Sequence, residues 1–154
     1  MRIVKIRGFR RKHRKITVEV SRQTLSQWLD ILAEAEEVSY YYTDYYHEKP
    51  LFEALQERIQ NTLSTPMDTY TIILKDAEVG GLFGYLCAAT NIDTEDYPMK
   101  LTEDEVEALF VEADTLFHEI NPWIRQAIKK RIEEGDEIYK ELYKDIYEET
   151  LKDK

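Results

Sequence analysis

Residues 15–28 read Lys-Ile-Thr-Val-Glu-Val-Ser-Arg-Gln-Thr-Leu-Ser-Gln-Trp, and the spacing of the hydrophobic residues changes in the middle of this stretch. Ile16, Val18 and Val20 alternate with polar residues, which is typical of a half-buried β-strand. The apolar residues that follow recur instead at the spacing of a helical face, and Ser21 is suited to cap that helix. A strand that leads directly into a helix predicts a fold with both elements.

The preceding segment, Arg2-Ile-Val-Lys-Ile-Arg7, alternates in the same way. The two runs predict an antiparallel β-hairpin, joined by residues 8–14, which lack the Asn-Gly signal of a two-residue turn. Tyr70-Thr-Ile-Ile-Leu74 is rich in β-branched and aromatic residues and predicts a third strand near residues 69–75. We therefore expect a small antiparallel sheet.

Helices are predicted for the rest of the chain, each from apolar residues at helical spacing. Their apolar sets are Leu25, Trp28, Leu29, Leu32 and Ala35; Leu51, Leu55, Ile59 and Leu63; Val79, Leu82, Phe83 and Leu86; Val106, Leu109, Phe110, Ala113, Leu116 and Phe117; Ile124, Ala127, Ile128 and Ile132; and Ile138, Leu142 and Ile146. Start signals are Pro50 at a first helical position, a Thr102-x-x-Glu105 capping box and Asn121-Pro122. The predicted fold is α+β and mainly helical, with an N-terminal antiparallel hairpin packed against five or six helices.

The size and composition of the chain favour one soluble domain. A chain of 154 residues predicts a single domain over 1–154, with a basic hairpin at 1–20 and an acidic, mainly helical body at 21–154. The single cysteine, Cys87, cannot form an internal disulfide, which suits a reducing compartment. The longest mostly apolar stretch, residues 79–89, is far shorter than the ~18 residues of a membrane span. We expect a cytoplasmic protein without membrane contact.

Positive and negative charge are separated along the chain. Residues 1–22 carry nine Lys and Arg against one Glu, a net charge of +8, whereas residues 23–154 carry twelve against thirty Asp and Glu, a net charge of −18. Such asymmetry indicates a contact with nucleic acid or another acidic surface, or a basic arm that lies on the protein's own acidic body. Both interpretations stay open at this point.

Much of the positive charge lies at the predicted hairpin tip, where residues 10–15 are all basic or titratable. Arg and Lys suit the phosphate oxygens of nucleic acid, and a two-stranded ribbon is narrow enough to enter the major groove of DNA. We hypothesise a small, non-enzymatic regulatory protein that contacts nucleic acid through this tip. The residues expected to bind are Arg10, Arg11, Lys12, Arg14 and Lys15. In the competing interpretation, the tip is clamped onto the acidic body.

The acidic body supports an alternative function. Carboxylates on the outward positions of the helices can imitate a phosphate backbone, so the chain can be an acidic inhibitor or adaptor that blocks a nucleic-acid-processing protein. Stripes of Tyr and Leu on the last helix predict a homodimer. Many charged residues and few Asn, Gln and Met residues are typical of a thermophilic source. Small size without catalytic motifs suits a virus-encoded regulator.

Motifs of known enzymes are absent from the sequence. The glycines of Val79-Gly-Gly-Leu-Phe-Gly84 lack the spacing of a phosphate-binding loop or a dinucleotide fingerprint. Asp114 and His118 would share a helix face as two metal ligands do, but that spacing is equally typical of an ordinary polar pair. Asp68 and Lys75 beside the third strand are the basis of one more alternative, a metal-dependent nuclease. We expect no enzyme activity, no metal and no cofactor.

A run of tyrosines, Tyr40-Tyr-Tyr-Thr-Asp-Tyr-Tyr46, allows two interpretations. Exposed tyrosines would provide stacking platforms for unpaired bases. Tyr42, Tyr45 and Tyr46 fall at helical spacing, however, which favours packing against a neighbouring helix.

Overall fold

A computed structural model describes residues 1–8, 14–35, 45–92, 98–144 and 148 of the chain. It divides into two compact units, Met1–Leu116 and Phe117–Lys154, each of which is described by itself. The prediction of a single domain over residues 1–154 stays a prediction. No helix among the described residues is both long enough and apolar enough to span a membrane.

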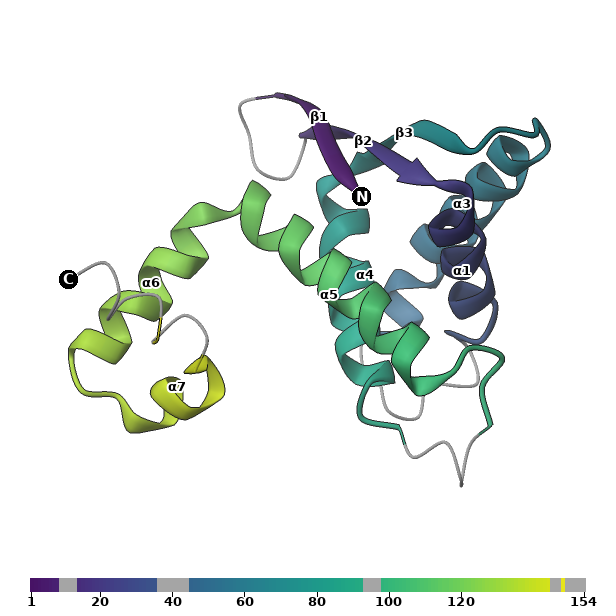
Figure 1. The fold of residues 1–154 in the computed structure, drawn as a ribbon. Coiled ribbons are helices and arrows are strands. Elements are labelled where there is room, and N and C mark those ends of the chain that lie inside the picture. The colour runs from purple at the N-terminus through teal and green to yellow at the C-terminus, as the bar shows by residue number, and fades with distance from the viewer. Residues whose placement is uncertain (9–13, 36–44, 93–97, 145–147, 149–154) are drawn as a thin grey trace. The chain divides into compact units, whose positions relative to one another are not determined.

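The first unit contains the three-stranded antiparallel sheet that the sequence predicts. Strands β1 (Arg2–Arg7), β2 (Lys15–Ser21) and β3 (Thr69–Lys75) lie in the order β1-β2-β3 (Figure 1). β2 is therefore central, and β1 and β3 are the edges. The register between β1 and β2 shifts between Ile3 and Lys5, whereas β2 and β3 pair without interruption. The α+β, mainly helical fold with a third strand at residues 69–75 is confirmed.

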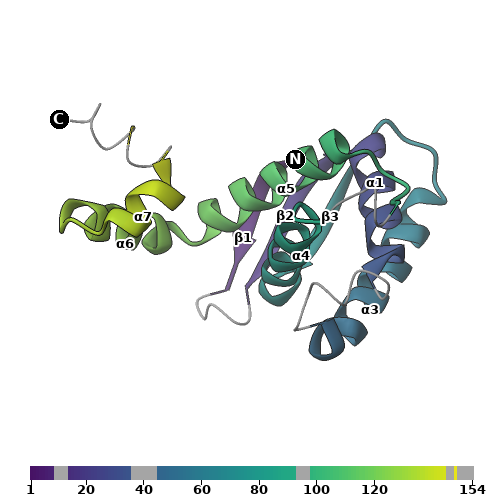
Figure 2. The same ribbon diagram turned by 90° about the horizontal axis from the view of Figure 1, so that it is seen from below.

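Helices complete both units. Their bounds are α1 Arg22–Ala33, α3 Tyr45–Leu63, α4 Asp76–Ala89, α5 Glu103–Ile120, α6 Pro122–Glu133 and α7 Glu137–Leu142. Helices α1, α3 and α4 lie on the same side of the sheet in both views of the first unit (Figures 1 and 2). These three helices cover one face of the sheet and leave the opposite face open within the described part of the first unit.

Alternation along β2 separates these two faces. Ile16, Val18 and Val20 are buried against the helices. Lys15, at the start of this central strand, is exposed on the opposite face. The core below them is made by apolar residues of α1, α3, α4 and α5, among them Leu25, Leu55, Leu82 and Leu109. The period-two pattern in the sequence therefore predicts correctly which residues of β2 face the core.

The predicted helix starts are largely confirmed. The Ser21 hydroxyl accepts a hydrogen bond from the N–H of Thr24 at 3.1 Å, as an N-cap does. At α5 the capping box is complete, because Glu105 N–H donates to the Thr102 hydroxyl at 3.2 Å and Thr102 N–H donates to the Glu105 carboxylate at 3.0 Å. These signals act within four residues, so tertiary structure does not override them.

Other details of the helix predictions were wrong. α3 begins at Tyr45 and carries Pro50 inside it, so Pro50 does not mark the start of that helix. Ala127 is exposed on α6, and Phe110 and Phe117 are only half-buried. Helical spacing places a residue on a face, but the neighbouring elements decide how much of that face is covered.

Gly81 on α4 allows a close approach to α3. A Cβ at this position would lie 3.2 Å from an oxygen of the Glu48 carboxylate and 3.3 Å from the Phe52 ring. The sequence predicts a close approach at the glycines of this helix, and Gly81 provides one.

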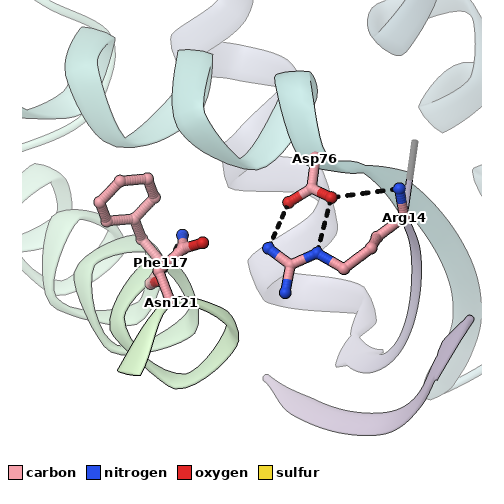
Figure 3. Close-up of polar contacts among 4 residues, drawn as sticks. All are labelled: Arg14, Asp76, Phe117 and Asn121. Carbon is pink, nitrogen blue, oxygen red and sulfur yellow. Dashed lines mark hydrogen bonds and ion pairs between the residues drawn. The ribbon is translucent and has the colours of Figure 1, made fainter. Parts of the chain in front are cut away.

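The second unit contains α6 and α7. Asn121 stands at the N-cap position of α6, but its side-chain amide donates to the carbonyl of Phe117 at 2.9 Å (Figure 3). Gly135 ends α6 with a φ of 92°, and two backbone hydrogen bonds, from Gly135 to Ile132 and from Asp136 to Arg131, complete a Schellman motif. The last stretch of the predicted final helix, with Ile146, lies outside the described residues.

Candidate nucleic-acid interface

Arg14, at the end of the hairpin connection, is held by Asp76 at the start of α4. The Arg14 side chain donates from Nε at 2.9 Å and from Nη2 at 2.8 Å to the two oxygens of the Asp76 carboxylate, and the Arg14 N–H donates to it at 3.2 Å (Figure 3). The two side chains are only 13% and 12% exposed. Arg14 is therefore bound to the acidic body, as the second of the two interpretations of the basic tip predicts for this residue.

Lys15, the next residue, has the opposite environment. It is exposed on the sheet face that the helices leave open, and it is paired by register with Arg7 on β1 and Lys75 on β3. Arg7 and Lys75 are exposed as well. We call Arg7, Lys15 and Lys75 the basic row; with strands about 4.8 Å apart, it extends over roughly 10 Å.

Lys5 extends this positive surface along β1, since it pairs with Thr17 on the same open face. Across the described ranges, no ion pair compensates Lys5 or any member of the basic row. Glu19, an acidic side chain of β2 on this face, instead pairs with Arg2 at 3.2 Å. Positive charge thus accumulates at the end of the sheet nearest the hairpin connection.

A buried carboxylate fixes the corner where β3 meets α4. Glu78 is buried, accepts from the backbone N–H of Lys75 at 2.8 Å, and pairs through its other oxygen with Arg58 of α3. The exposed Lys75 side chain therefore projects from a backbone that is tied to two helices. A fixed backbone loses less conformational entropy when a ligand binds. The Lys75 ammonium group is therefore presented from a fixed position to a bound anion.

The structure brings together only part of the site that the sequence predicts. Arg14 and Lys15 are described, and they divide into one clamped and one exposed cation. Arg10, Arg11 and Lys12 lie outside the described residues, as do positions 40–44 of the tyrosine run. Lys5, Arg7 and Lys75 were not predicted as nucleic-acid-binding residues, because hairpin register and the position of β3 decide which cations are neighbours; the sequence had associated Lys75 only with the nuclease alternative.

A metal centre was the weaker possibility in the sequence. In the portion of the chain that is described, no group of three or more His, Cys, Asp or Glu side chains could hold a metal ion. Asp114 and His118 are both half-buried on α5. The basic row presents one guanidinium and two ammonium groups to solvent, an arrangement that is suited to bind an anion.

Comparisons with known proteins do not identify this arrangement: no protein-family model, curated protein or solved structure matches the chain significantly.

Proposed function

We propose that this chain is a small, non-enzymatic regulatory protein that contacts nucleic acid through the basic end of its sheet. The observation that carries the proposal is the alignment of Arg7, Lys15 and Lys75 on the sheet face opposite α1, α3 and α4. Lys15 belongs to the predicted tip, and the tip residues Arg10, Arg11 and Lys12 follow Arg7 and Gly8 closely in the chain.

Electrostatics favour a phosphate backbone as the partner. Duplex DNA carries one negative charge per ~1.7 Å of its axis, so cations spread over roughly 10 Å can contact several phosphates at once. The chain as a whole has a net charge of −10 and is repelled by polyanions at long range. Binding through a local positive surface would therefore orient the protein, with its acidic helices turned away from the nucleic acid.

The proposal is tested by fluorescence anisotropy with a labelled duplex of about 20 base pairs over a series of salt concentrations. Three phosphate contacts predict a slope of log K against log salt near −2.7, since each contact contributes about −0.9. Lys15→Gln and Lys75→Gln should each weaken binding and lower the magnitude of that slope by about 0.9. The matched control is Lys100→Gln, which also removes one exposed cation, but one already paired with Asp30 at 2.8 Å.

Unchanged affinity in both Lys15→Gln and Lys75→Gln would overturn the proposal. The two alternative functions have their own signatures. Recovery of the same protein partner from a cell extract with and without nuclease treatment would favour an acidic inhibitor or adaptor. Cleavage of the labelled duplex only after addition of Mg²⁺ or Mn²⁺ would favour a metal-dependent nuclease.

A further inference from the structure

Strand β3 has an edge with backbone groups that point away from the sheet. The Ile73 carbonyl accepts a hydrogen bond from the Arg58 guanidinium of α3, and the Lys75 N–H donates to Glu78 of α4, so both groups face away from β2. In an antiparallel strand the N–H and C=O of one residue point to the same side, and this side alternates along the strand. The N–H groups of Thr71 and Ile73 and the carbonyl of Thr71 must therefore face the open edge.

A groove lies beside this edge. Its volume is about 410 Å³, and it is lined by residues of α3, including Leu55, Arg58, Ile59 and Asn61, and by residues 71–73 of β3. Leu55 and Ile59 are buried and supply an apolar wall, whereas Asn61 is exposed at the rim. Ile72 is half-buried on the core side of β3, where an added strand would direct every second side chain. We call this feature the α3–β3 groove.

Charge around the groove indicates what kind of chain would fit. Arg58 is the charged side chain among the lining residues, and no carboxylate lines the groove within the described part of the chain. An added strand would lie beside the free edge of β3. Its side chains on the open face of the sheet would be close to Lys75, and Lys15 would lie two strands away on β2. Its outward side chains would therefore meet positive charge, and its inward side chains an apolar wall.

We infer that the α3–β3 groove binds an extended peptide segment of a partner protein, in which apolar and acidic residues alternate, by strand addition to β3. Main-chain hydrogen bonds to Thr71 and Ile73 would hold the segment, and its alternate side chains would enter the groove. Charge complementarity between its acidic residues and Lys75 fixes which face of the segment turns outward. The two proposed contacts share Lys75, but the groove itself lies at the β3 edge and the inference does not depend on nucleic-acid binding.

The contact between Arg58 and Ile73 also serves a simpler purpose. Proteins protect edge strands against uncontrolled pairing by covering them with charged side chains or neighbouring elements, and Arg58 of α3 covers the Ile73 carbonyl in this way. Arg58 covers a single carbonyl, however, and leaves the outward groups of Thr71 unoccupied by any described side chain. A guanidinium has five N–H donors, so Arg58 can donate to a main-chain carbonyl of the incoming segment without losing its pairing with Glu78.

The experiment uses a fluorescein-labelled octapeptide that alternates valine and glutamate, titrated against the full chain by anisotropy. A peptide with proline in place of one central valine and of the glutamate next to it is the negative control, because in either strand orientation one of these two positions loses an N–H that faces β3. Asn61→Trp should fill the rim of the groove and weaken binding at least tenfold. Gln60→Trp, an exposed neighbour on the same helix that does not line the groove, should leave binding unchanged.

Hydrogen exchange followed by NMR on the wild-type chain provides a measurement that needs no variant. Saturating peptide should slow the exchange of the Thr71 and Ile73 amides at least tenfold, whereas the Ile72 amide already faces β2 and should change little. The inference would be overturned by unchanged exchange at Thr71 and Ile73, or by equal binding of the proline peptide. It would also fail if Lys15→Gln abolished binding while Asn61→Trp did not, because the peptide would then rest on the basic row. Protection that rises with protein concentration in the absence of peptide would assign the edge to a second copy of the chain and would equally refute the partner segment.

Discussion

Replacing Asp76 with alanine should be among the most damaging single changes outside the apolar core. It removes a carboxylate that accepts three hydrogen bonds from Arg14 and leaves the Arg14 guanidinium and backbone N–H without that partner. Breaking a buried ion pair by removing one partner costs about 3–5 kcal/mol. Both side chains keep about a tenth of their surface exposed, at 13% and 12%, so water can replace part of the lost interaction. We therefore expect a loss of about 2–3 kcal/mol in the free energy of unfolding.

Arg14→Ala should cost less, about 1–2 kcal/mol, because the remaining Asp76 carboxylate lies in the first turn of α4, where the helix dipole and solvent stabilise a negative charge. The double variant should cost less than the sum of the two single losses, with a coupling energy of about 1–2 kcal/mol. Urea denaturation followed by tryptophan fluorescence measures all three differences.

Salt separates this contact from an ordinary surface pair. A surface pair weakens as salt rises, whereas a mostly buried pair is screened much less, so the coupling energy should persist in about 1 M NaCl. A cost below about 0.5 kcal/mol for Asp76→Ala would mean that the two side chains are not paired in solution. A coupling energy that vanishes at high salt would refute the assignment of Arg14 to a buried ion pair. Arg14 would then again be a candidate for binding phosphate as an exposed cation.

Three further predictions concern α5. Leu109→Ala should cost about 2–5 kcal/mol in urea denaturation, because Leu109 is buried and its removal leaves a cavity; a loss within the range of surface substitutions would mean that α5 does not pack as described. Thr102→Ala should cost about 1 kcal/mol through loss of the N-cap hydroxyl, and Thr102→Ser should recover most of it. Hydrogen bonds from Thr102 hold the pKa of Glu105 below its ordinary value of 4.5, so the stabilisation is complete above that value and is lost as pH falls through the lower folded-state pKa. Glu105→Gln, which cannot titrate, should therefore lose less stability than the wild type on acidification through this range, and equal losses would contradict the linkage.

Local patterns in the sequence predicted the elements of the fold because the forces behind them act over a few residues. Alternation identified β2, and the residues at its alternate positions are the buried ones. The capping box at Thr102 and Glu105 located the start of α5 to within a residue. The predicted start at Pro50 was wrong because proline favours the first turn of a helix without being confined to it. Helix α3 already begins at Tyr45, five residues before Pro50.

The candidate site was only partly visible in the sequence. A run of basic residues indicated positive charge at the hairpin tip, but it did not distinguish Arg14 from Lys15, which are neighbours in the chain. Adjacent residues of a strand point to opposite sides, and at the start of β2 Arg14 reaches α4 whereas Lys15 reaches solvent. Lys75 belongs to the same surface although it is 60 positions further along the chain than Lys15.

The sequence by itself thus determined the class of fold, the position of most helices and strands, and the separation of a basic N-terminal segment from an acidic body. Short-range hydrogen bonds, side-chain periodicity and composition contain that information. Only the tertiary structure decided that β2 lies between β1 and β3, that Asp76 neutralises Arg14, and that Arg7, Lys15 and Lys75 form a single row. Each of these depends on strand order and register, which pair residues far apart in the chain and are selected by how well the whole core packs against α1, α3 and α4.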